Sequence, residues 1–249
     1  MKIDTPPIVY DYSAFLLDWD GTPVDSMPIW NELYTGYIRS KGRVPHENFQ
    51  QEKDDILHSL AKADNVFARL YDELHRIYDI KGISGEEALA ESTLVSEEKL
   101  RTLQYKPNAA KFLRDVKALG MKMAVVTTGD NASFDAIRRG NFKMRAEADF
   151  DQIFEGRIIT SDICKSLGIQ GKPSGDPYRY GARLLNIAPK DCLVFEDSMN
   201  GAKAGWDAGM DMCIVRDSYS DKDREEMKYI AKHVPTKTYF IEDLGEVRY

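Results

Sequence analysis

Cysteine is scarce in this chain of 249 residues, which contains only Cys164, Cys192 and Cys213. The number is odd and no Cys-x-x-Cys pair occurs, so the sequence argues against a disulfide framework and against a zinc knuckle. Free cysteines behave as small hydrophobic residues and are commonly buried. We therefore expect three free, buried thiols in a reducing compartment.

Long apolar runs and an excess of basic residues are also missing. No stretch approaches the about 20 consecutive apolar residues of a membrane helix. The N-terminal segment 1–10 contains an acid and two prolines in place of the apolar stretch of a signal peptide. The formal net charge is −7, whereas nucleic-acid binding commonly uses a basic face. These absences predict a cytoplasmic protein without a membrane or nucleic-acid partner.

The composition is that of a folded globular protein, because 43% of the residues are apolar and 30% are charged. Short apolar runs have the character of buried strands in a parallel sheet. They occur at 14–17, 123–126, 158–159, 192–195 and 212–215. Helical signals separate these runs. For example, Asp176 and Pro177 suit the N-cap and the first turn of a helix. Strands that alternate with helices predict an α/β fold with a parallel sheet between helices.

The segment 27–105 interrupts this alternation and has a different pattern. Apolar residues recur at helical spacing between Val66 and Tyr78, which indicates one face of an amphipathic helix. Ser84 and Glu87 have the spacing of a capping box, which starts another helix. The segment contains no alternating strand pattern. The predicted domains are therefore an all-helical insertion, 27–105, and a core formed by 1–26 and 106–249.

Polar residues follow the predicted strands at the points where those strands end. Because the carboxyl ends of parallel strands meet at one edge of a sheet, where ligands bind, these side chains form the candidate site. They are Asp18 and Asp20, Thr127 and Thr128, and Glu196 and Asp197, together with Lys172 before a later helix. Clustered carboxylates need a cation, and hard oxygen ligands suit Mg²⁺. A lysine ammonium and a threonine hydroxyl suit phosphoryl oxygens.

Four segments resemble the motifs of the haloacid dehalogenase superfamily and occur in that family's order. Residues 17–26 read Leu-Asp-Trp-Asp-Gly-Thr-Pro-Val-Asp-Ser and resemble its strand followed by Asp-x-Asp-Gly-Thr. Val-Val-Thr at 125–127, Gly-Lys-Pro at 171–173 and Phe-Glu-Asp at 195–197 resemble the other three motifs. The helical insertion resembles the cap of the subgroup that contains β-phosphoglucomutase and phosphoglycolate phosphatase. The resemblance implies a Rossmann-like core with an inserted α-helical cap domain.

The resemblance assigns chemical roles to two acidic residues of the first motif. Asp18 would attack phosphorus as the nucleophile and become an aspartyl phosphate. Asp20 would protonate the leaving oxygen and then activate water. A mixed anhydride splits one difficult reaction into two easier steps, which suits a weak nucleophile such as a carboxylate. Most of the catalysis is positioning and charge stabilisation, because two anions have to approach each other.

The resemblance also implies how the cofactor and the phosphoryl group are bound. The implied Mg²⁺ ligands are the Asp18 carboxylate, the Asp20 backbone carbonyl and Asp197, with Glu196 as a direct or indirect helper. The implied phosphate-binding groups are the Thr127 side chain, the Thr128 backbone N–H and Lys172. The catalytic set is therefore Asp18, Asp20, Thr127 and Lys172.

These implications predict a Mg²⁺-dependent phosphatase that acts on a small phosphorylated metabolite such as a sugar phosphate. The alternative is a phosphomutase of the β-phosphoglucomutase kind, whose members have a His shortly after the first motif and an Arg and a Lys in the cap. Trp30 stands where that His is expected, and 45–60 contains no Lys-Gly-x-Ser-Arg segment, which favours hydrolysis. A non-catalytic binding protein is disfavoured because Asp18, Asp20 and Lys172 are all present.

Two tryptophans near the first motif are candidates for substrate contact. Trp19 lies between the two aspartates, and Trp30 lies at the start of the helical insertion. For Trp30, packing at the base of the cap is the alternative interpretation. The sequence identifies neither the substrate nor the cap residues that select it, and we expect a monomer or a weak homodimer.

Overall fold

The computed structural model describes residues 2–3, 5–60, 63, 65–217 and 221–249. The chain divides into two compact units. The core unit comprises Met1–Ser26 and Leu103–Tyr249, and the helical unit comprises Met27–Thr102. Each unit has its own buried cluster of side chains, so each is described by itself.

The helical unit ends at Thr102, whereas the sequence places the boundary after Tyr105. The intervening residues are bound to the core unit. The backbone N–H of Asp25 donates to the carbonyl of Gln104 (2.9 Å), and the Tyr105 hydroxyl donates to the carbonyl of Ala148 (2.7 Å). These hydrogen bonds fix the returning chain to the core unit.

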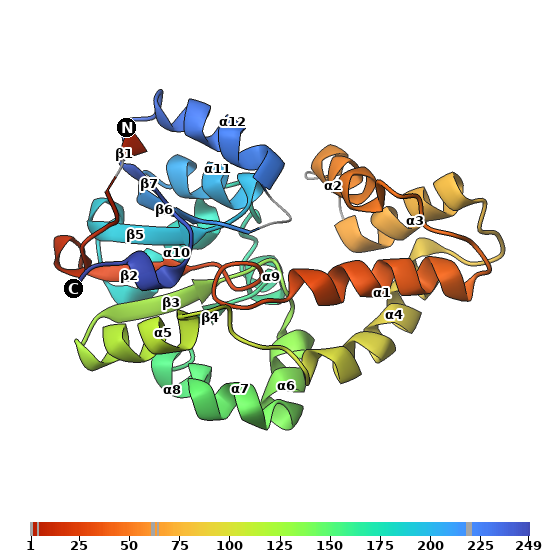
Figure 1. The fold of residues 1–249 in the computed structure, drawn as a ribbon, viewed down its shortest axis with the longest axis horizontal. Helices are drawn as coiled ribbons and strands as arrows, with labels where there is room; N and C mark the ends of the chain where they lie inside the picture. Colours follow the sequence, from red (N-terminus) through yellow and green to blue (C-terminus); the bar gives the residue numbers. More distant parts are fainter. Residues whose placement is uncertain (1, 4, 61–62, 64, 218–220) are drawn as a thin grey trace. The chain divides into compact units, whose positions relative to one another are not determined.

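In the part of the core unit that the structure describes, seven strands form a parallel sheet in the order β1-β7-β6-β5-β2-β3-β4 (Figure 1). The strands are β1 (Lys2–Ile3), β2 (Ala14–Leu17), β3 (Lys122–Val126), β4 (Ile158–Ile159), β5 (Cys192–Glu196), β6 (Asp211–Val215) and β7 (Thr238–Ile241). Every neighbouring pair is parallel. The five predicted strands are confirmed, and β1 and β7 extend the sheet at one edge.

Helices connect these strands. They are α5 (Ala109–Ala118), α6 (Asn131–Gly140), α7 (Phe142–Glu147), α8 (Phe150–Phe154), α9 (Ser161–Ser166), α10 (Asp176–Leu185), α11 (Met199–Asp207) and α12 (Asp221–Ala231), with the 3₁₀ helices η1 (Val9–Asp11), η2 (Pro189–Asp191) and η3 (Leu244–Glu246). They cover both faces of the sheet. Leu16 of β2 packs in one cluster with Tyr178 of α10. Phe15, on the other face, stacks on Phe112 of α5 with ring centroids 6.2 Å apart. All four residues of β2 are therefore buried, which explains its continuous apolar run.

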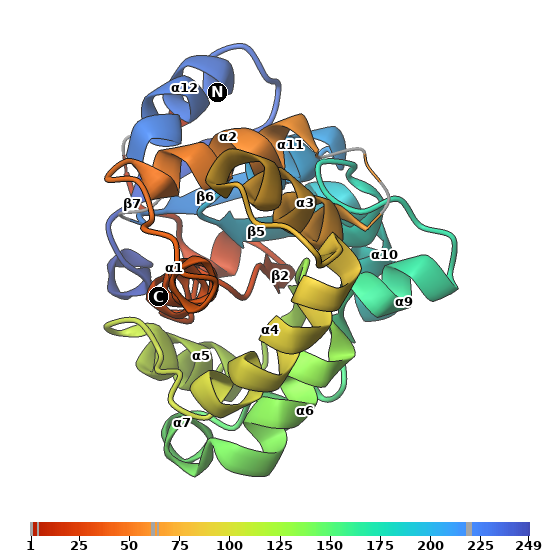
Figure 2. The same cartoon turned by 90° about the vertical axis from the view of Figure 1, so that its right-hand side faces the viewer.

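The helical unit contains α1 (Met27–Ser40), α2 (Phe49–Ser59), α3 (Val66–Tyr78) and α4 (Gly85–Leu100). Figure 2 shows α1 end-on, with α2, α3 and α4 around it. The predicted apolar stripe is confirmed, because Leu70, Tyr71 and Leu74 of α3 are buried in the unit's hydrophobic cluster. The predicted capping box is also confirmed. The Glu87 backbone N–H donates to Ser84 Oγ (3.2 Å), and the Ser84 backbone N–H donates to Glu87 Oε2 (2.8 Å).

The three cysteines are free and buried, as the sequence predicts. Burial raises the pKa of the Cys192 thiol to about 12, so that thiol stays protonated and acts as an apolar core group. Among the described residues, none of the helices combines the length and the apolar character needed to cross a bilayer.

Candidate active site

The carboxyl ends of β2 and β5 bring two acidic residues together. The strands β2 and β5 are adjacent in the sheet (Figure 1). Their parallel register pairs Leu17 with Phe195, so the next residues along the two strands, Asp18 and Glu196, are also neighbours. The backbone N–H of Asp18 donates to the carbonyl of Phe195 (2.9 Å). The Lys172 ammonium bridges the two acids, with Nζ 2.6 Å from Asp18 Oδ1 and 2.5 Å from Glu196 Oε1.

The Glu196 carboxylate is fully buried and tightly held. Its Oε1 also accepts a hydrogen bond from the Tyr178 hydroxyl (2.8 Å). Its Oε2 accepts from the backbone N–H groups of Asp197 (3.1 Å) and Ser198 (3.2 Å) and from the Ser198 hydroxyl (3.1 Å). These bonds fix the side chain in the orientation that meets Lys172.

The Asp197 carboxylate lies against the loop that follows Asp18. Its Oδ1 accepts from the Thr22 hydroxyl (2.9 Å). Gly21 has a φ of +81°, and a Cβ at that position would lie 2.4 Å from Asp197 Oδ2. Glycine is therefore required at position 21 both by the left-handed backbone and by the close approach of the carboxylate.

Three carboxylates gather at this edge of the sheet. Asp18, Glu196 and Asp197 each offer an oxygen within 4.8 Å of the others, and all three side chains are buried. Burial raises the pKa of Asp18 well above its usual range, the Lys172 ammonium opposes that rise, and the Glu196 carboxylate adds to it. Burial also raises the pKa of Asp197 well above its usual range, and the other two carboxylates add to that rise.

The donor set fits a divalent cation. Burial alone would lower the pKa of Lys172, but the carboxylates of Asp18 and Glu196 more than offset it and raise that pKa, so the ammonium stays protonated. This ammonium contacts Asp18 and Glu196, and the neighbouring Asp197 adds a third carboxylate to the group, so one positive charge does not balance the three acids. A hard cation with oxygen ligands would relieve that repulsion, and Mg²⁺ is of this kind.

Thr127 follows β3 and approaches the same region as Asp20. The Thr127 backbone N–H donates to the carbonyl of Ile159 (2.9 Å), and its hydroxyl accepts from the Gly129 backbone N–H (3.0 Å). A Cβ on Gly129 would lie 3.3 Å from Thr127 Oγ1 and 3.7 Å from Asp20 Oδ2. The side chains of Thr127 and Asp20 therefore both lie next to Gly129. The neighbouring Thr128 is exposed.

The two tryptophans pack inside their own units. Trp19 is 2% exposed and contacts the rings of Tyr105, Phe134, Phe150 and Phe154 in the core unit. This burial gives Trp19 a packing role in place of the predicted substrate contact. Trp30 is half-buried and packs against the hydrophobic cluster of the helical unit, in agreement with its alternative interpretation.

The structure adds two site residues to which the sequence assigned no role. Thr22 lies within the first motif and binds Asp197 through its hydroxyl. Tyr178 lies on α10, is fully buried and binds Glu196, with the Lys172 ammonium 4.9 Å from its ring centroid. An aromatic residue near the start of an amphipathic helix is an ordinary core position, so the sequence carries no signal for this contact.

The family of haloacid dehalogenase-like hydrolases matches residues 12–209, which is most of the chain. The chain belongs to this family. The predicted superfamily resemblance is therefore confirmed. Hexitol phosphatase A of Escherichia coli (strain K12) is 28% identical over 208 residues, which are 81% of this chain and 82% of that protein. Protein CbbY of Cereibacter sphaeroides is 31% identical over 120 residues, 48% of each chain.

Solved structures of the haloacid dehalogenase-like family share the fold. CbbY from Rhodobacter sphaeroides in complex with phosphate gives a TM-score of 0.70 at 19% identity and covers 94% of this chain and 96% of its own. A putative β-phosphoglucomutase from Thermotoga maritima gives 0.65 at 22% identity and covers 94% and 95%. The predicted fold, a Rossmann-like parallel sheet with inserted helices, is confirmed.

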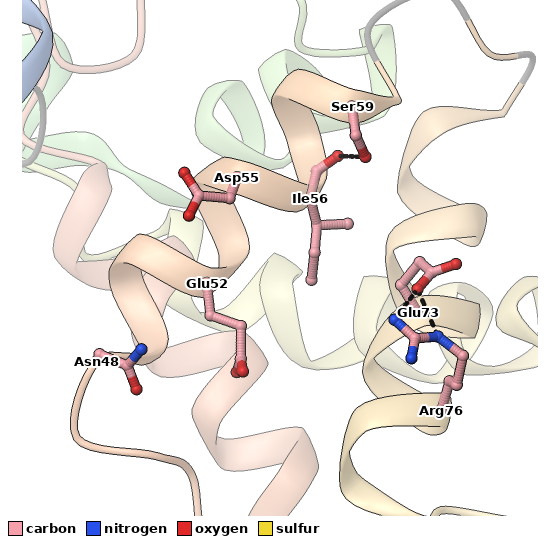
Figure 3. A pocket seen from close by; sticks show the side chains of 7 residues that line it. All are labelled: Asn48, Glu52, Asp55, Ile56, Ser59, Glu73 and Arg76. Carbon is pink, nitrogen blue, oxygen red and sulfur yellow. Dashed lines mark hydrogen bonds and ion pairs between the residues drawn. The ribbon is translucent and has the colours of Figure 1, made fainter.

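The helical unit also has a polar groove of its own, about 440 Å³ in volume, between α2 and α3. Figure 3 shows its lining, in which Arg76 is paired with Glu73 (Nη2–Oε2 2.8 Å). The other ionisable lining residues are the acids Glu52 and Asp55. An anionic phosphate group is poorly matched to such a lining, so this groove is not a candidate phosphate site.

Replacing Gly201 by alanine is expected to displace the Glu196 carboxylate. A Cβ on Gly201 would lie 1.8 Å from Glu196 Cδ, so the acid has to leave its hydrogen bonds. We expect the kcat with which the variant hydrolyses its substrate to fall by about tenfold or more relative to the wild type. Gly36→Ala on α1 is the matched control, because that helical glycine has open space around its Cβ position. Steady-state kinetics check this, and equal kcat values for the two variants would contradict it.

Proposed function

We propose that this protein is a Mg²⁺-dependent phosphatase that hydrolyses a small phosphorylated metabolite through a phosphoaspartate at Asp18. The observation that carries the proposal is the contact of the buried Asp18 carboxylate with the Lys172 ammonium at 2.6 Å, beside Glu196 and Asp197. This contact supports the proposal, because a buried carboxylate, an ammonium and further carboxylate oxygens lie together at the carboxyl ends of β2 and β5. Membership of a hydrolase family supports the same conclusion.

In the first step, an oxygen of Asp18 forms a bond to phosphorus as the bond to the substrate oxygen breaks. Asp20 gives its proton to that leaving oxygen. The Lys172 ammonium, the Thr127 hydroxyl and the Thr128 backbone N–H bind the phosphoryl oxygens. They offset the repulsion between the carboxylate and the phosphate dianion.

In the second step, a water molecule attacks the phosphorus of the phosphoaspartate. Asp20, now ionised, takes a proton from that water, so the acid of the first step serves as the base of the second. The bond between phosphorus and the Asp18 oxygen breaks, and inorganic phosphate and the Asp18 carboxylate are regenerated. The protons and the charges balance over the two steps.

The Asp18 carboxylate, the Asp20 backbone carbonyl and Asp197, helped by Glu196, would hold the Mg²⁺ ion. Bound there, the ion would offset the negative charge of the acidic cluster, which consists of Asp18, Glu196 and Asp197, and part of the phosphate charge. The Thr22 hydroxyl orients Asp197 for this purpose, and the left-handed Gly21 allows the close approach of its carboxylate.

The proposed substrate is a phosphorylated sugar or sugar alcohol. The name of the Escherichia coli relative, hexitol phosphatase A, supports this class, as does the name of a Thermotoga maritima relative, phosphorylated carbohydrates phosphatase, which is 24% identical over 204 residues. We propose that the helical unit, Met27–Thr102, acts as a cap that excludes bulk water and selects the leaving group. The three free buried thiols support a cytoplasmic location, and the monomeric or weakly dimeric state stays a prediction.

The test of hydrolysis against phosphomutase activity uses β-glucose 1-phosphate with a trace of glucose bisphosphate and Mg²⁺. We expect release of inorganic phosphate with or without the bisphosphate, because water rather than a second sugar hydroxyl attacks the phosphoaspartate. Phosphate and glucose 6-phosphate are measured in the same reaction. A screen of sugar and sugar-alcohol phosphates, run beside it, identifies the preferred substrate. Rapid formation of glucose 6-phosphate with negligible phosphate release would contradict the proposal and support the mutase alternative.

A further inference from the structure

Lys106 is a nearly buried lysine that the proposed chemistry does not use. Its side chain is 16% exposed, and that of its partner Asp217 is 4% exposed. The ammonium donates to three acceptors, the carbonyl of Gly21 (2.7 Å), the carbonyl of Arg216 (2.8 Å) and Asp217 Oδ2 (2.9 Å). A lysine ammonium has three donors, so these acceptors match its full capacity.

The first acceptor belongs to the loop 19–24, which carries Asp20. This loop is closed by its own backbone, because the Gly21 N–H donates to the carbonyl of Val24 (2.9 Å). The Lys106 backbone N–H donates to the carbonyl of Pro23 (2.9 Å). Lys106 therefore binds the loop at two carbonyls, one through its backbone and one through its side chain.

The Gly21 carbonyl belongs to the peptide that joins Gly21 to Thr22. A hydrogen bond to that carbonyl fixes the plane of the peptide and the direction in which Thr22 leaves it. Thr22 then donates to Asp197 Oδ1 at 2.9 Å. Lys106 is thereby connected to the acidic cluster through one peptide and one side chain, and to Asp20 through the adjoining residue of the loop.

Through its other two acceptors, Lys106 connects the loop 19–24 to the residues that follow β6. Arg216 and Asp217 directly follow β6, which pairs with β5. The Asp217 carboxylate forms an ion pair with the Lys106 ammonium at 2.9 Å. This ion pair offsets the cost of burying the Asp217 charge.

We propose that Lys106 is a positioning residue that holds the loop 19–24 and Asp217 in place, so that Asp20 and Thr22 stay aligned with the acidic cluster. Its effect on turnover rests on the proposed phosphatase function. Its effect on the order of the loop does not. Lys106 does not touch the reacting atoms in this account.

The test compares Lys106→Met with the double variant Lys106→Met/Asp217→Asn in the full-length protein. The single variant takes the Lys106 ammonium away from the buried Asp217 carboxylate, which itself destabilises the fold. The double variant also removes the charge of residue 217 and leaves the Gly21 carbonyl without its side-chain donor. Lys122→Met is the matched control, because Lys122 also donates to a backbone carbonyl (Leu185, 3.0 Å) but at the opposite end of β3.

We expect the double variant to melt within about 3 °C of the wild type. Its kcat for p-nitrophenyl phosphate is expected to fall by about tenfold or more, with KM changed less than about threefold, because a small displacement of catalytic groups lowers the rate of the chemical step. Lys106→Arg keeps the positive charge and hydrogen-bond donors at position 106, so its kcat should lie between that of the wild type and that of the double variant. A double variant with a kcat within about twofold of the wild type would overturn the proposal.

Hydrogen exchange separates this proposal from the proposed function. We expect faster amide exchange in a peptide covering 19–25 in the double variant, and unchanged exchange there in Lys122→Met. This readout needs no substrate, so it tests the loop even if the wild type hydrolyses no phosphate ester. Unchanged exchange in 19–25 would overturn the positioning role, whereas an inactive wild type with faster exchange in the variant would overturn only the proposed function.

Discussion

Replacing Asp18 by asparagine should abolish phosphate release while the protein remains folded. An amide nitrogen or oxygen at this position does not form an acyl phosphate that water can hydrolyse, so we expect kcat to fall by about 10⁴-fold or more. The substitution keeps the size of the side chain, and Lys172 keeps its contact with Glu196 at 2.5 Å, so the core unit should be preserved. Steady-state kinetics with p-nitrophenyl phosphate and circular dichroism measure the two effects.

Asp211→Asn is the matched control for this prediction. Asp211 is half-buried at the start of β6, and it accepts hydrogen bonds from the Tyr12 hydroxyl (3.0 Å) and the Lys237 backbone N–H (2.8 Å). Asp211 lies at the amino end of β6, whereas the acidic cluster lies at the carboxyl ends of the strands. The Asp211→Asn variant should therefore keep kcat within about twofold of the wild type. An Asp18→Asn protein that retains more than about a tenth of the wild-type kcat would exclude Asp18 as the nucleophile.

Removal of divalent cations should also abolish turnover. The carboxylates of Asp18, Glu196 and Asp197 lie together and are buried, and the Lys172 ammonium pairs with the first two. Without a metal ion, the repulsion from these acids therefore opposes the approach of a phosphate dianion. We expect EDTA to lower kcat by about 10³-fold or more and added Mg²⁺ to restore it. Asp197→Asn should raise the Mg²⁺ concentration needed for half-maximal activity by at least about tenfold.

Thermal melting gives a test of the metal site that does not depend on activity. Ligands that bind only the folded protein raise its Tm, so Mg²⁺ should raise the Tm of the wild type. Asp197→Asn removes one of the crowded charges, so its metal-free Tm should lie above that of the metal-free wild type, and Mg²⁺ should raise it less. Undiminished hydrolysis in metal-free buffer, together with a Tm that Mg²⁺ does not change, would contradict the metal assignment.

The elements with strong local patterns could be predicted from the sequence. The run 14–17 forms β2, because a strand that is buried on both faces has a continuous run of apolar residues. The stripe between Val66 and Tyr78 forms α3, because a helix that is buried on one face has apolar residues at helical spacing. The edge strand β1 and its neighbour β7 were not predicted. β1 contains a single apolar residue, Ile3. β7 begins with Thr238 and leaves Phe240 partly exposed, so neither strand has the continuous buried apolar run that identifies β2.

Part of the candidate site could also be predicted, because strand ends in a parallel sheet converge. This rule brings Asp18 together with Glu196 and Asp197. The rule does not predict contacts made by side chains that do not directly follow a strand. The position of Tyr178 depends on how α10 packs, and that of Lys106 depends on hydrogen bonds made after the chain returns to the core unit.

For Trp19, the sequence predicted a substrate contact that the structure does not show. Its place between Asp18 and Asp20 suggested a substrate contact, but successive residues leaving a strand point in opposite directions. The indole lies among four aromatic rings of the core unit. Sequence position beside a proposed catalytic residue therefore did not determine the direction of the side chain.

Trapping the covalent phosphate at Asp18 tests the central claim most directly. p-Nitrophenolate leaves without needing a proton, so an Asp20→Asn variant should still form the phosphoaspartate but hydrolyse it slowly, for lack of a base. We expect a burst of about one equivalent of p-nitrophenolate per protein molecule. Borohydride reduction should then convert residue 18 to homoserine, as identified by mass spectrometry of the peptide, with no conversion in Asp18→Asn. Sustained hydrolysis with residue 18 unmodified would contradict a phosphoaspartate at Asp18.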